Sequence, residues 1–227
     1  MISVVVDVDD TLVDTRKRTQ KIWELVLGRG IPLEDVGSLT ARGIFEKHAS
    51  REQRARIDEL RREFNDILLC RNEEGIRLLG LDEPVPFAAE ALREWGPRCR
   101  LVYLTGRLES LRDATLGELA RFGFPADAEL VMSDPEDWGG PRPGASLADA
   151  RTRLFSAITE RHDVARVVDD FPGYFPTYRQ FDVPERIGLL RSRLYKPQDY
   201  VERGATRVVE SWEKLISDPP RHRTAGP

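Results

Sequence analysis

The chain of 227 residues has little that would indicate a secreted or membrane-bound protein. It contains only two cysteines, Cys70 in a predicted amphipathic helix and Cys99 at the start of a predicted strand, so we expect buried thiols and no disulfide. No apolar run is long enough to span a bilayer, and the N-terminus reads directly into a strand instead of a signal peptide. These absences favour a soluble, cytoplasmic protein.

The composition also lacks an excess of charge of one sign. A formal net charge of -4 gives no general attraction to nucleic acid or to an anionic membrane, so neither is expected as a partner. The charges between positions 42 and 74 are intermixed, as is typical of a solvated helix face. His48 and His162 have no Cys or His at ligand spacing, which argues against a histidine- or cysteine-based metal site. The partners of the chain must therefore be inferred from its candidate site.

What the chain does contain is an acidic stretch directly after its first predicted strand. The run from Val4 to Val6 is β-branched and of the length expected for a buried strand, and Asp7, Asp9 and Asp10 follow. In parallel α/β sheets, ligands bind outside the carboxyl ends of the strands. Crowded carboxylates repel one another unless a cation neutralises them, so the stretch predicts a metal site. A lone D-x-D is also typical of an ordinary turn, so the rest of the chain has to decide.

Two later apolar strands also end in polar groups. The strand at 101–104 is followed by Thr105, Gly106 and Arg107, and the strand at 164–168 by Asp169 and Asp170. With further strands at 130–132 and 187–190 and helical patterns between them, the chain predicts a three-layer, Rossmann-like α/β core with a mainly parallel five-stranded sheet. A last helix is expected over 206–216, and a disordered tail over 217–227.

A long insertion separates the first two of these strands. Asp7 and Thr105 are roughly a hundred positions apart, whereas a strand-helix-strand unit needs only about 30 residues. Between them we find only helical signals, the clearest being a capping box at Ser50 and Gln53. The sequence therefore predicts a core formed by 1–14 and 88–216, interrupted by an α-helical subdomain over 15–87.

Taken together and in this order, the three polar strand ends resemble the haloacid dehalogenase superfamily. Its first motif, D-x-D-x-T, is matched by residues 7–11, its second, an apolar strand ending in Thr-Gly-Arg, by 102–107, and its fourth, apolar residues followed by two aspartates, by 167–170. The inserted helices resemble the α-helical cap of this family in size and place. The resemblance implies a phosphatase-type member with a cap between its first and second motifs.

The resemblance also implies a role for each acidic residue. Asp7 would be the nucleophile toward phosphorus, and Asp9 would protonate the leaving oxygen and then activate water. Members of the dehalogenase type replace this second acid, so the presence of Asp9 favours phosphoryl chemistry. Thr105 and Gly106 would bind the phosphoryl group. The implied cofactor is Mg²⁺, with ligands from Asp7, Asp169, Asp170 and the backbone carbonyl of Asp9.

The third motif of the family is not matched cleanly. It supplies a lysine, but the predicted helix before Val164 has no lysine, and the candidates that we consider there are Arg151 and Arg153. Arginine can bind phosphate through two parallel hydrogen bonds, although it is bulkier and planar. We favour Arg153 as the phosphate-binding residue, with Arg151 as the alternative. Arg107 is expected to brace its loop and to take no part in catalysis.

The expected activity is Mg²⁺-dependent hydrolysis of a small phosphomonoester, such as a phosphorylated metabolite, because a cap over the site would hinder a polymer end. Phosphoryl transfer, as in a sugar phosphomutase, and phosphonate hydrolysis with an amine from Lys17, Lys21 or Lys47 stay open. So does a non-catalytic scaffold that binds phosphate or metal, against which the intact pair of Asp7 and Asp9 argues. The sequence leaves the substrate's identity and the choice between monomer and homodimer undecided.

Overall fold

The computed structural model describes residues 1–134 and 147–220, and in it the chain divides into two compact units. The first unit consists of Met1–Val13, Pro84–Arg191 and Tyr195–Pro227. The second consists of Asp14–Glu83 and Ser192–Leu194. In the described ranges, no helix combines the length and the apolar character that crossing a bilayer would require.

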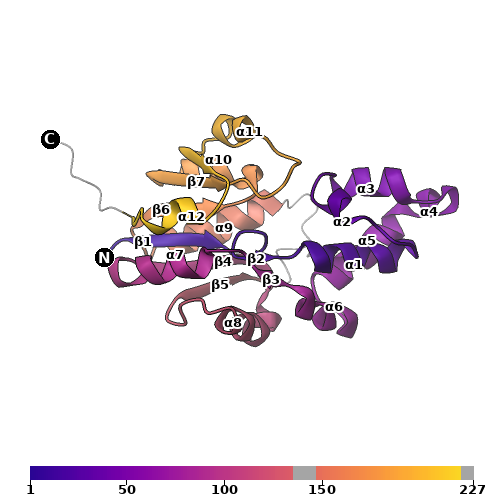
Figure 1. The fold of residues 1–227 in the computed structure, drawn as a ribbon, viewed down its shortest axis with the longest axis horizontal. Helices are drawn as coiled ribbons and strands as arrows, with labels where there is room; N and C mark the ends of the chain where they lie inside the picture. Colours follow the sequence, from indigo (N-terminus) through magenta and orange to yellow (C-terminus); the bar gives the residue numbers. More distant parts are fainter. Residues whose placement is uncertain (135–146, 221–227) are drawn as a thin grey trace. The chain divides into compact units, whose positions relative to one another are not determined.

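A parallel sheet of six strands forms the middle of the first unit, in the order β5-β4-β1-β6-β7-β8 (Figure 1). The strands are β1 (Ser3–Asp7), β4 (Arg100–Leu108), β5 (Glu129–Ser133), β6 (Val164–Asp169), β7 (Glu185–Leu189) and β8 (Arg207–Val209). Every neighbouring pair is parallel, so the predicted α/β class with a mainly parallel sheet is confirmed. The expected number of five strands is wrong. The sixth strand, β8, pairs with β7 and takes up the first part of the segment predicted as a helix over 206–216.

Helices cover both faces of this sheet (Figure 1). They are α7 (Ala88–Trp95), α8 (Arg112–Arg121), α9 (Leu147–Thr159), α10 (Phe175–Gln180), α11 (Pro197–Glu202) and α12 (Glu213–Ile216), with short 3₁₀ turns η2 (Gly96–Arg98), η3 (Glu109–Leu111) and η5 (Pro172–Tyr174). Residues of α9, α10 and α11 pack with Val5, Val102 and Val167 on one face. On the other face, Trp95 of α7 packs at 5.6 Å from Trp212, between ring centroids. Successive side chains of each strand point to opposite faces of the sheet, so the strands contribute to two cores, as a three-layer fold requires.

The C-terminal end of the described chain is held by a buried arginine. Arg166 on β6 is 1% exposed and donates through Nη1 to the backbone oxygen of Asp218 at 2.6 Å. Its guanidinium lies 4.8 Å from the Trp95 ring centroid and also pairs with Glu185 at 2.6 Å. The tail predicted from 217 onward therefore begins too early, and residues 221–227 lie outside the described residues.

The second unit is built mainly from helices, and its main segment, Asp14–Glu83, ends four residues before the predicted bound of 87. The helices are α1 (Arg16–Leu27), α2 (Leu33–Val36), α3 (Ala41–His48), α4 (Arg51–Ala55), α5 (Ile57–Leu68), α6 (Glu73–Leu78) and the 3₁₀ turn η1 (Leu79–Leu81). The short strands β2 (Val13–Asp14) and β3 (Glu83–Pro84) form a separate two-stranded sheet. The predicted capping box of Ser50 and Gln53 is present at the start of α4. Trp23 of α1 stacks on Phe64 of α5 at 4.2 Å between ring centroids, in a core of its own.

Candidate active site

Three parallel strands bring their polar ends to one edge of the sheet. Asp7, the last residue of β1, is in register with Leu104 of β4, and Val6 is in register with Val168 of β6. Thr105 and Asp169, each the next residue along its own strand, therefore lie level with the end of β1. The strands run parallel because helical crossovers connect them, so their carboxyl ends necessarily meet at the same edge.

Three of the predicted acidic residues form a compact cluster at this edge. Asp7, Asp169 and Asp170 each offer a carboxylate oxygen, and these oxygens lie within 4.8 Å of one another. Burial, followed by repulsion from Asp169, raises the pKa of Asp7 well above its usual value, while Arg151 opposes the rise. Burial and the neighbouring charges of Asp10 and Asp7 likewise raise the pKa of Asp170. Oxygen ligands this close and this poorly solvated fit a hard divalent cation such as Mg²⁺.

Hydrogen bonds from the surrounding chain hold the fourth-motif aspartates in place. Asp169 accepts the backbone N–H of Phe171 at 2.8 Å and the hydroxyl of Tyr178. Asp170 accepts the hydroxyl of Thr11 at 3.2 Å. Tyr200 donates its hydroxyl to the backbone oxygen of Asp170. The two tyrosines are fully buried, and no local sequence pattern indicates their role, because they reach the site from helices that follow it in the chain.

Arg151, rather than Arg153, lies beside the candidate nucleophile. Its Nη2 lies 2.5 Å from Oδ1 of Asp7 and 3.9 Å from Oδ2 of Asp169. Its guanidinium lies over the ring of Tyr174, 4.2 Å from the centroid. Among residues 1–134 and 147–220, Nη1 is buried without a hydrogen-bond partner. Arg153 on the same helix is solvent-exposed, so our preference for it is wrong.

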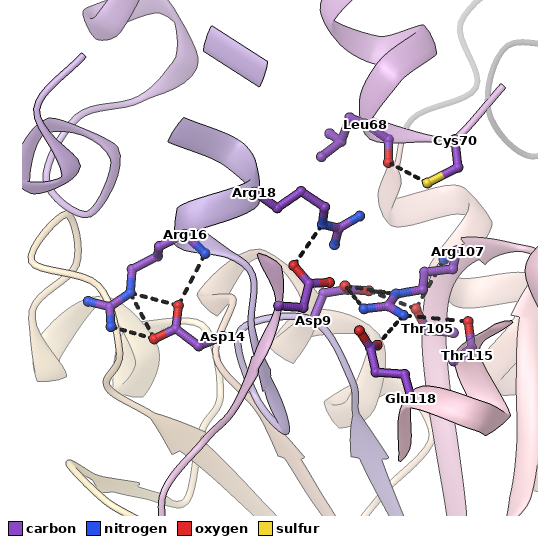
Figure 2. Close-up of polar contacts among 11 residues, drawn as sticks. Asp9, Asp14, Arg16, Arg18, Leu68, Cys70, Thr105, Arg107, Thr115 and Glu118 are labelled. Atoms are coloured by element: carbon purple, nitrogen blue, oxygen red, sulfur yellow. Dashed lines mark hydrogen bonds and ion pairs between the residues drawn. The ribbon is translucent and has the colours of Figure 1, made fainter. Parts of the chain in front are cut away.

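Asp9 lies at the same edge but has other partners. Its carboxylate accepts the hydroxyl of Thr105 at 2.9 Å and the Nε of Arg107 at 3.0 Å. Arg107 also donates through Nη1 to Glu118 on α8 at 2.5 Å, as Figure 2 shows. Thr105, predicted to bind phosphate, is fully buried and is bonded to Asp9 here, while Gly106 beside it is half-buried. The contacts of Arg107 go beyond the loop-bracing role that the sequence suggested.

The fold and the acidic cluster at the carboxyl edge of its sheet define an α/β protein of the Rossmann-like class whose site lies at the strand ends. Within that class, the chain has the fold of the haloacid dehalogenase superfamily. It is similar to a haloacid dehalogenase-like hydrolase from Streptococcus pneumoniae at 15% identity and a TM-score of 0.60, covering 95% of this chain and 97% of that one. It is also similar to a hydrolase of the same superfamily, subfamily IA, from Geobacter sulfurreducens, at 14% identity and a TM-score of 0.60, covering 95% of each chain.

A third similar structure is a hydrolase of this family from Deinococcus radiodurans with bound phosphate and sodium. It has 20% identity and a TM-score of 0.55, covering 94% of this chain and 92% of that one. No protein-family model and no curated protein matches the sequence. These structures confirm, for the fold, the resemblance inferred from the motifs. Their sequence identities are too low to assign an activity to this chain.

Proposed function

We propose that this chain is a Mg²⁺-dependent phosphatase that hydrolyses a small phosphomonoester through a phosphorylated Asp7. The observation that carries the proposal is the pairing of Asp7 with Arg151 inside the cluster of carboxylates, while Asp9 is held beside it by separate partners. One carboxylate is thus available to attack and a second to transfer protons, which is the division of labour that phosphoryl transfer through an aspartate requires.

The reaction follows from these positions. An oxygen of Asp7 attacks phosphorus and forms the acyl-phosphate bond, while the bond from phosphorus to the leaving oxygen breaks and that oxygen takes a proton from Asp9. Water then attacks the phosphorus and gives a proton to Asp9, and the bond to Asp7 breaks to release inorganic phosphate. Asp9 is 31% exposed through its side chain, so it is accessible to both the leaving oxygen and water.

Two groups would neutralise the charge of the phosphate beside these acids. The side chains of Asp7, Asp169 and Asp170 with the backbone carbonyl of Asp9 would hold Mg²⁺, which when bound screens the nucleophile from the incoming phosphate. Arg151 would bind a phosphoryl oxygen through Nη1, the buried donor without a partner among the described residues. Thr105 and the backbone of Gly106 complete the proposed phosphate site.

We propose that the helical unit acts as the cap that restricts the site to small substrates. It is inserted between the first and second motifs, and the chain enters it at Asp14, seven residues after Asp7. The competing phosphonate chemistry would need a reactive amine, but the three candidate lysines are ion-paired. Lys17 pairs with Glu83, Lys21 with Glu24 and Lys47 with Asp35. These pairs favour phosphate esters over phosphonates as the substrate class.

The test is release of inorganic phosphate from an aryl phosphate by the full chain. Wild type is assayed with Mg²⁺ and with EDTA, beside Asp7→Asn and the control Asp113→Asn, which alters an exposed aspartate on α8. We expect hydrolysis by wild type and by the control with Mg²⁺, and none with EDTA or by Asp7→Asn. Mg²⁺ should also raise the melting temperature of wild type, since a ligand that binds only the folded state stabilises it.

Full activity in Asp7→Asn would overturn the proposal. So would folded wild type whose melting temperature rises with Mg²⁺ but which releases no phosphate from a panel of small phosphomonoesters. In that case a phosphorylated acceptor formed without free phosphate would indicate transfer, and the absence of any product would indicate a binding scaffold.

A further inference from the structure

Arg107 is a buried cation that links Asp9 to the interior of the first unit (Figure 2). Its Nε lies 3.0 Å and its Nη2 2.9 Å from Oδ1 of Asp9. On its other side, Nη1 lies 2.5 Å from Oε2 of Glu118 and 3.5 Å from Oγ1 of Thr115. The guanidinium therefore lies between a carboxylate of the site and a carboxylate of α8.

These contacts fix the orientation of Asp9 as well as its position. The side chains of Arg107 and Glu118 are each 5% exposed, whereas that of Asp9 is 31% exposed. The backbone N–H of Arg107 donates to Oγ1 of Thr105 at 3.0 Å, and that hydroxyl donates to Asp9 at 2.9 Å. Because a guanidinium presents its donors in a fixed plane, two of them on one carboxylate restrict its rotation. The Asp9 carboxylate is thus partly exposed to solvent, while the buried side chains of Arg107 and Thr105 fix its orientation.

The charge of Arg107 has a second consequence. Asp9 lies beside a cluster of three carboxylates, Asp7, Asp169 and Asp170, so its own negative charge is repelled from the site. Arg107 offsets this repulsion, and the buried partner Glu118 keeps the guanidinium in place. Without Arg107, both repulsion and hydration would turn the Asp9 carboxylate away from the cluster.

We infer that Arg107 is a positioning residue for the proposed reaction. It holds the Asp9 side chain where its protonated form gives a proton to the leaving oxygen and its carboxylate later takes one from water, and Glu118 in turn holds Arg107. The inference rests on the proposed phosphatase function. In this account Asp9 contacts the substrate, and Arg107 acts only through Asp9.

The test uses the dependence of the rate on the leaving group. A poorly acidic leaving group needs the proton from Asp9, whereas a strongly acidic one leaves without it. We expect Arg107→Met to lose about 10²-fold or more in kcat/KM for phenyl phosphate and far less for dinitrophenyl phosphate. Glu118→Gln should show a smaller loss of the same kind. The matched control is Arg112→Met, which removes an arginine paired with Glu109 at the surface and should behave like wild type.

Two further readouts separate positioning from other roles. Arg107→Lys should recover part of the activity toward phenyl phosphate, because it keeps the charge but not the planar pair of donors. The inhibition constant of inorganic phosphate should stay close to the wild-type value in Arg107→Lys, because in this account Arg107 acts on Asp9 and does not contact the phosphate. An equal loss for all leaving groups in Arg107→Met, or clearly weaker inhibition by phosphate in Arg107→Lys, would overturn the inference.

The design also separates this inference from the proposed function. Active wild type with a uniform loss in Arg107→Met would overturn the inference alone, whereas inactive wild type would overturn both. Arg107→Met leaves the carboxylate of Glu118 buried without its cation, which can prevent folding. The double variant Arg107→Met/Glu118→Met removes both charges and is used in the same leaving-group test. It should also lose much more kcat/KM for phenyl phosphate than for dinitrophenyl phosphate, and an equal loss for both would overturn the inference.

Discussion

The charge balance at Asp7 depends on one arginine side chain. The Arg151 guanidinium lies over the Tyr174 ring, 4.2 Å from the centroid, and contacts Asp7 through Nη2. In the proposed function, Nη1 would bind a phosphoryl oxygen. A lysine ammonium has no plane to stack on a ring and presents a single point charge, so it would not reproduce both contacts. In the proposed function, Arg151 would therefore take the place of the family's third-motif lysine through different contacts.

The first prediction concerns this arginine. Arg151→Met should lower kcat/KM for an aryl phosphate by about 10²- to 10³-fold, the usual cost of removing one donor to transition-state charge. Arg151→Lys should fall between Met and wild type, because only the charge is kept. Arg153→Met is the matched control on the same helix and should leave kcat/KM unchanged. A larger loss in Arg153→Met than in Arg151→Met would contradict this assignment.

The second prediction concerns a close contact behind the acidic cluster. A Cβ at Gly188 on β7 would lie 2.5 Å from Cδ1 of Tyr200, whose hydroxyl holds the backbone of Asp170. Gly188→Ala should therefore displace this ring, destabilise the protein by about 1–3 kcal/mol, and weaken the rise in melting temperature with Mg²⁺. Urea unfolding and thermal shift measure the two effects.

The control for this prediction is Gly117→Ala. A Cβ at Gly117 on α8 meets nothing within 4 Å, so the change should stabilise the protein by about 0.5–1 kcal/mol through helix propensity. Equal stability of Gly188→Ala and wild type would show that the Tyr200 contact is not tight.

The choice between the two arginines could have been made from the sequence. Arg151, Phe155 and Ile158 are spaced as one helix face, and both apolar residues are fully buried. Arg153 shares its face with Ala157 and Glu160, which are exposed. The contacts of Arg107 with Glu118 could not be read in this way. They depend on how α8 packs against β4, which no short pattern encodes.

At the scale of elements, the positions of β1, β4 and β6 follow from apolar runs that are long enough to be buried strands. Their polar ends meet because parallel strands place like ends together, so the residues of the acidic cluster could be assigned to one site from the sequence. The edge strand β8 could not be predicted from the sequence, because it has only three residues and is defined by its pairing with β7. Its Val208 and Val209 fit a helix stripe as well as a strand until that pairing is known.

The third prediction concerns the link between α2 and α3 in the helical unit. The side chain of Asp35 accepts hydrogen bonds from Lys47 at 2.8 Å and His48 at 2.6 Å, and these bonds lower the pKa of Asp35. A carboxyl whose pKa is lower in the folded state stabilises the fold above its unfolded pKa of about 3.9 and loses this contribution as pH falls through its folded pKa.

The stability difference between wild type and Asp35→Asn should therefore be largest above about pH 5 and shrink toward about pH 3. Urea unfolding at several pH values measures it. Asp66→Asn is the control, because Asp66 pairs with Arg71 at an exposed position where ion pairs contribute little. A difference for Asp35→Asn that is constant with pH would show that the carboxylate does not link the two helices.

At the scale of the whole molecule, the chain consists of an α/β core and a helical unit inserted in its first crossover. The insertion was visible in the sequence because the interval between the first two motifs is far longer than one crossover helix needs. Two other features of the molecule were not visible in the sequence. Ser192–Leu194, between β7 and α11, groups with the helical unit, where Ser192 donates to the backbone oxygen of Gly37 at 3.0 Å. Asp218, two residues after α12, is held by the buried Arg166, a contact that a polar C-terminal sequence does not reveal.

The central claim is that Asp7 becomes phosphorylated while Asp9 acts on the protons. The most direct measurement is the mass of Asp9→Asn after incubation with Mg²⁺ and dinitrophenyl phosphate, followed by peptide mapping. In this account the substrate should phosphorylate Asp7 without help from an acid, and the missing base should slow hydrolysis of the product. The account predicts one added phosphoryl group, located on Asp7 and absent from Asp7→Asn/Asp9→Asn. A phosphoryl group on another residue, or hydrolysis by wild type with none trapped in Asp9→Asn, would contradict it.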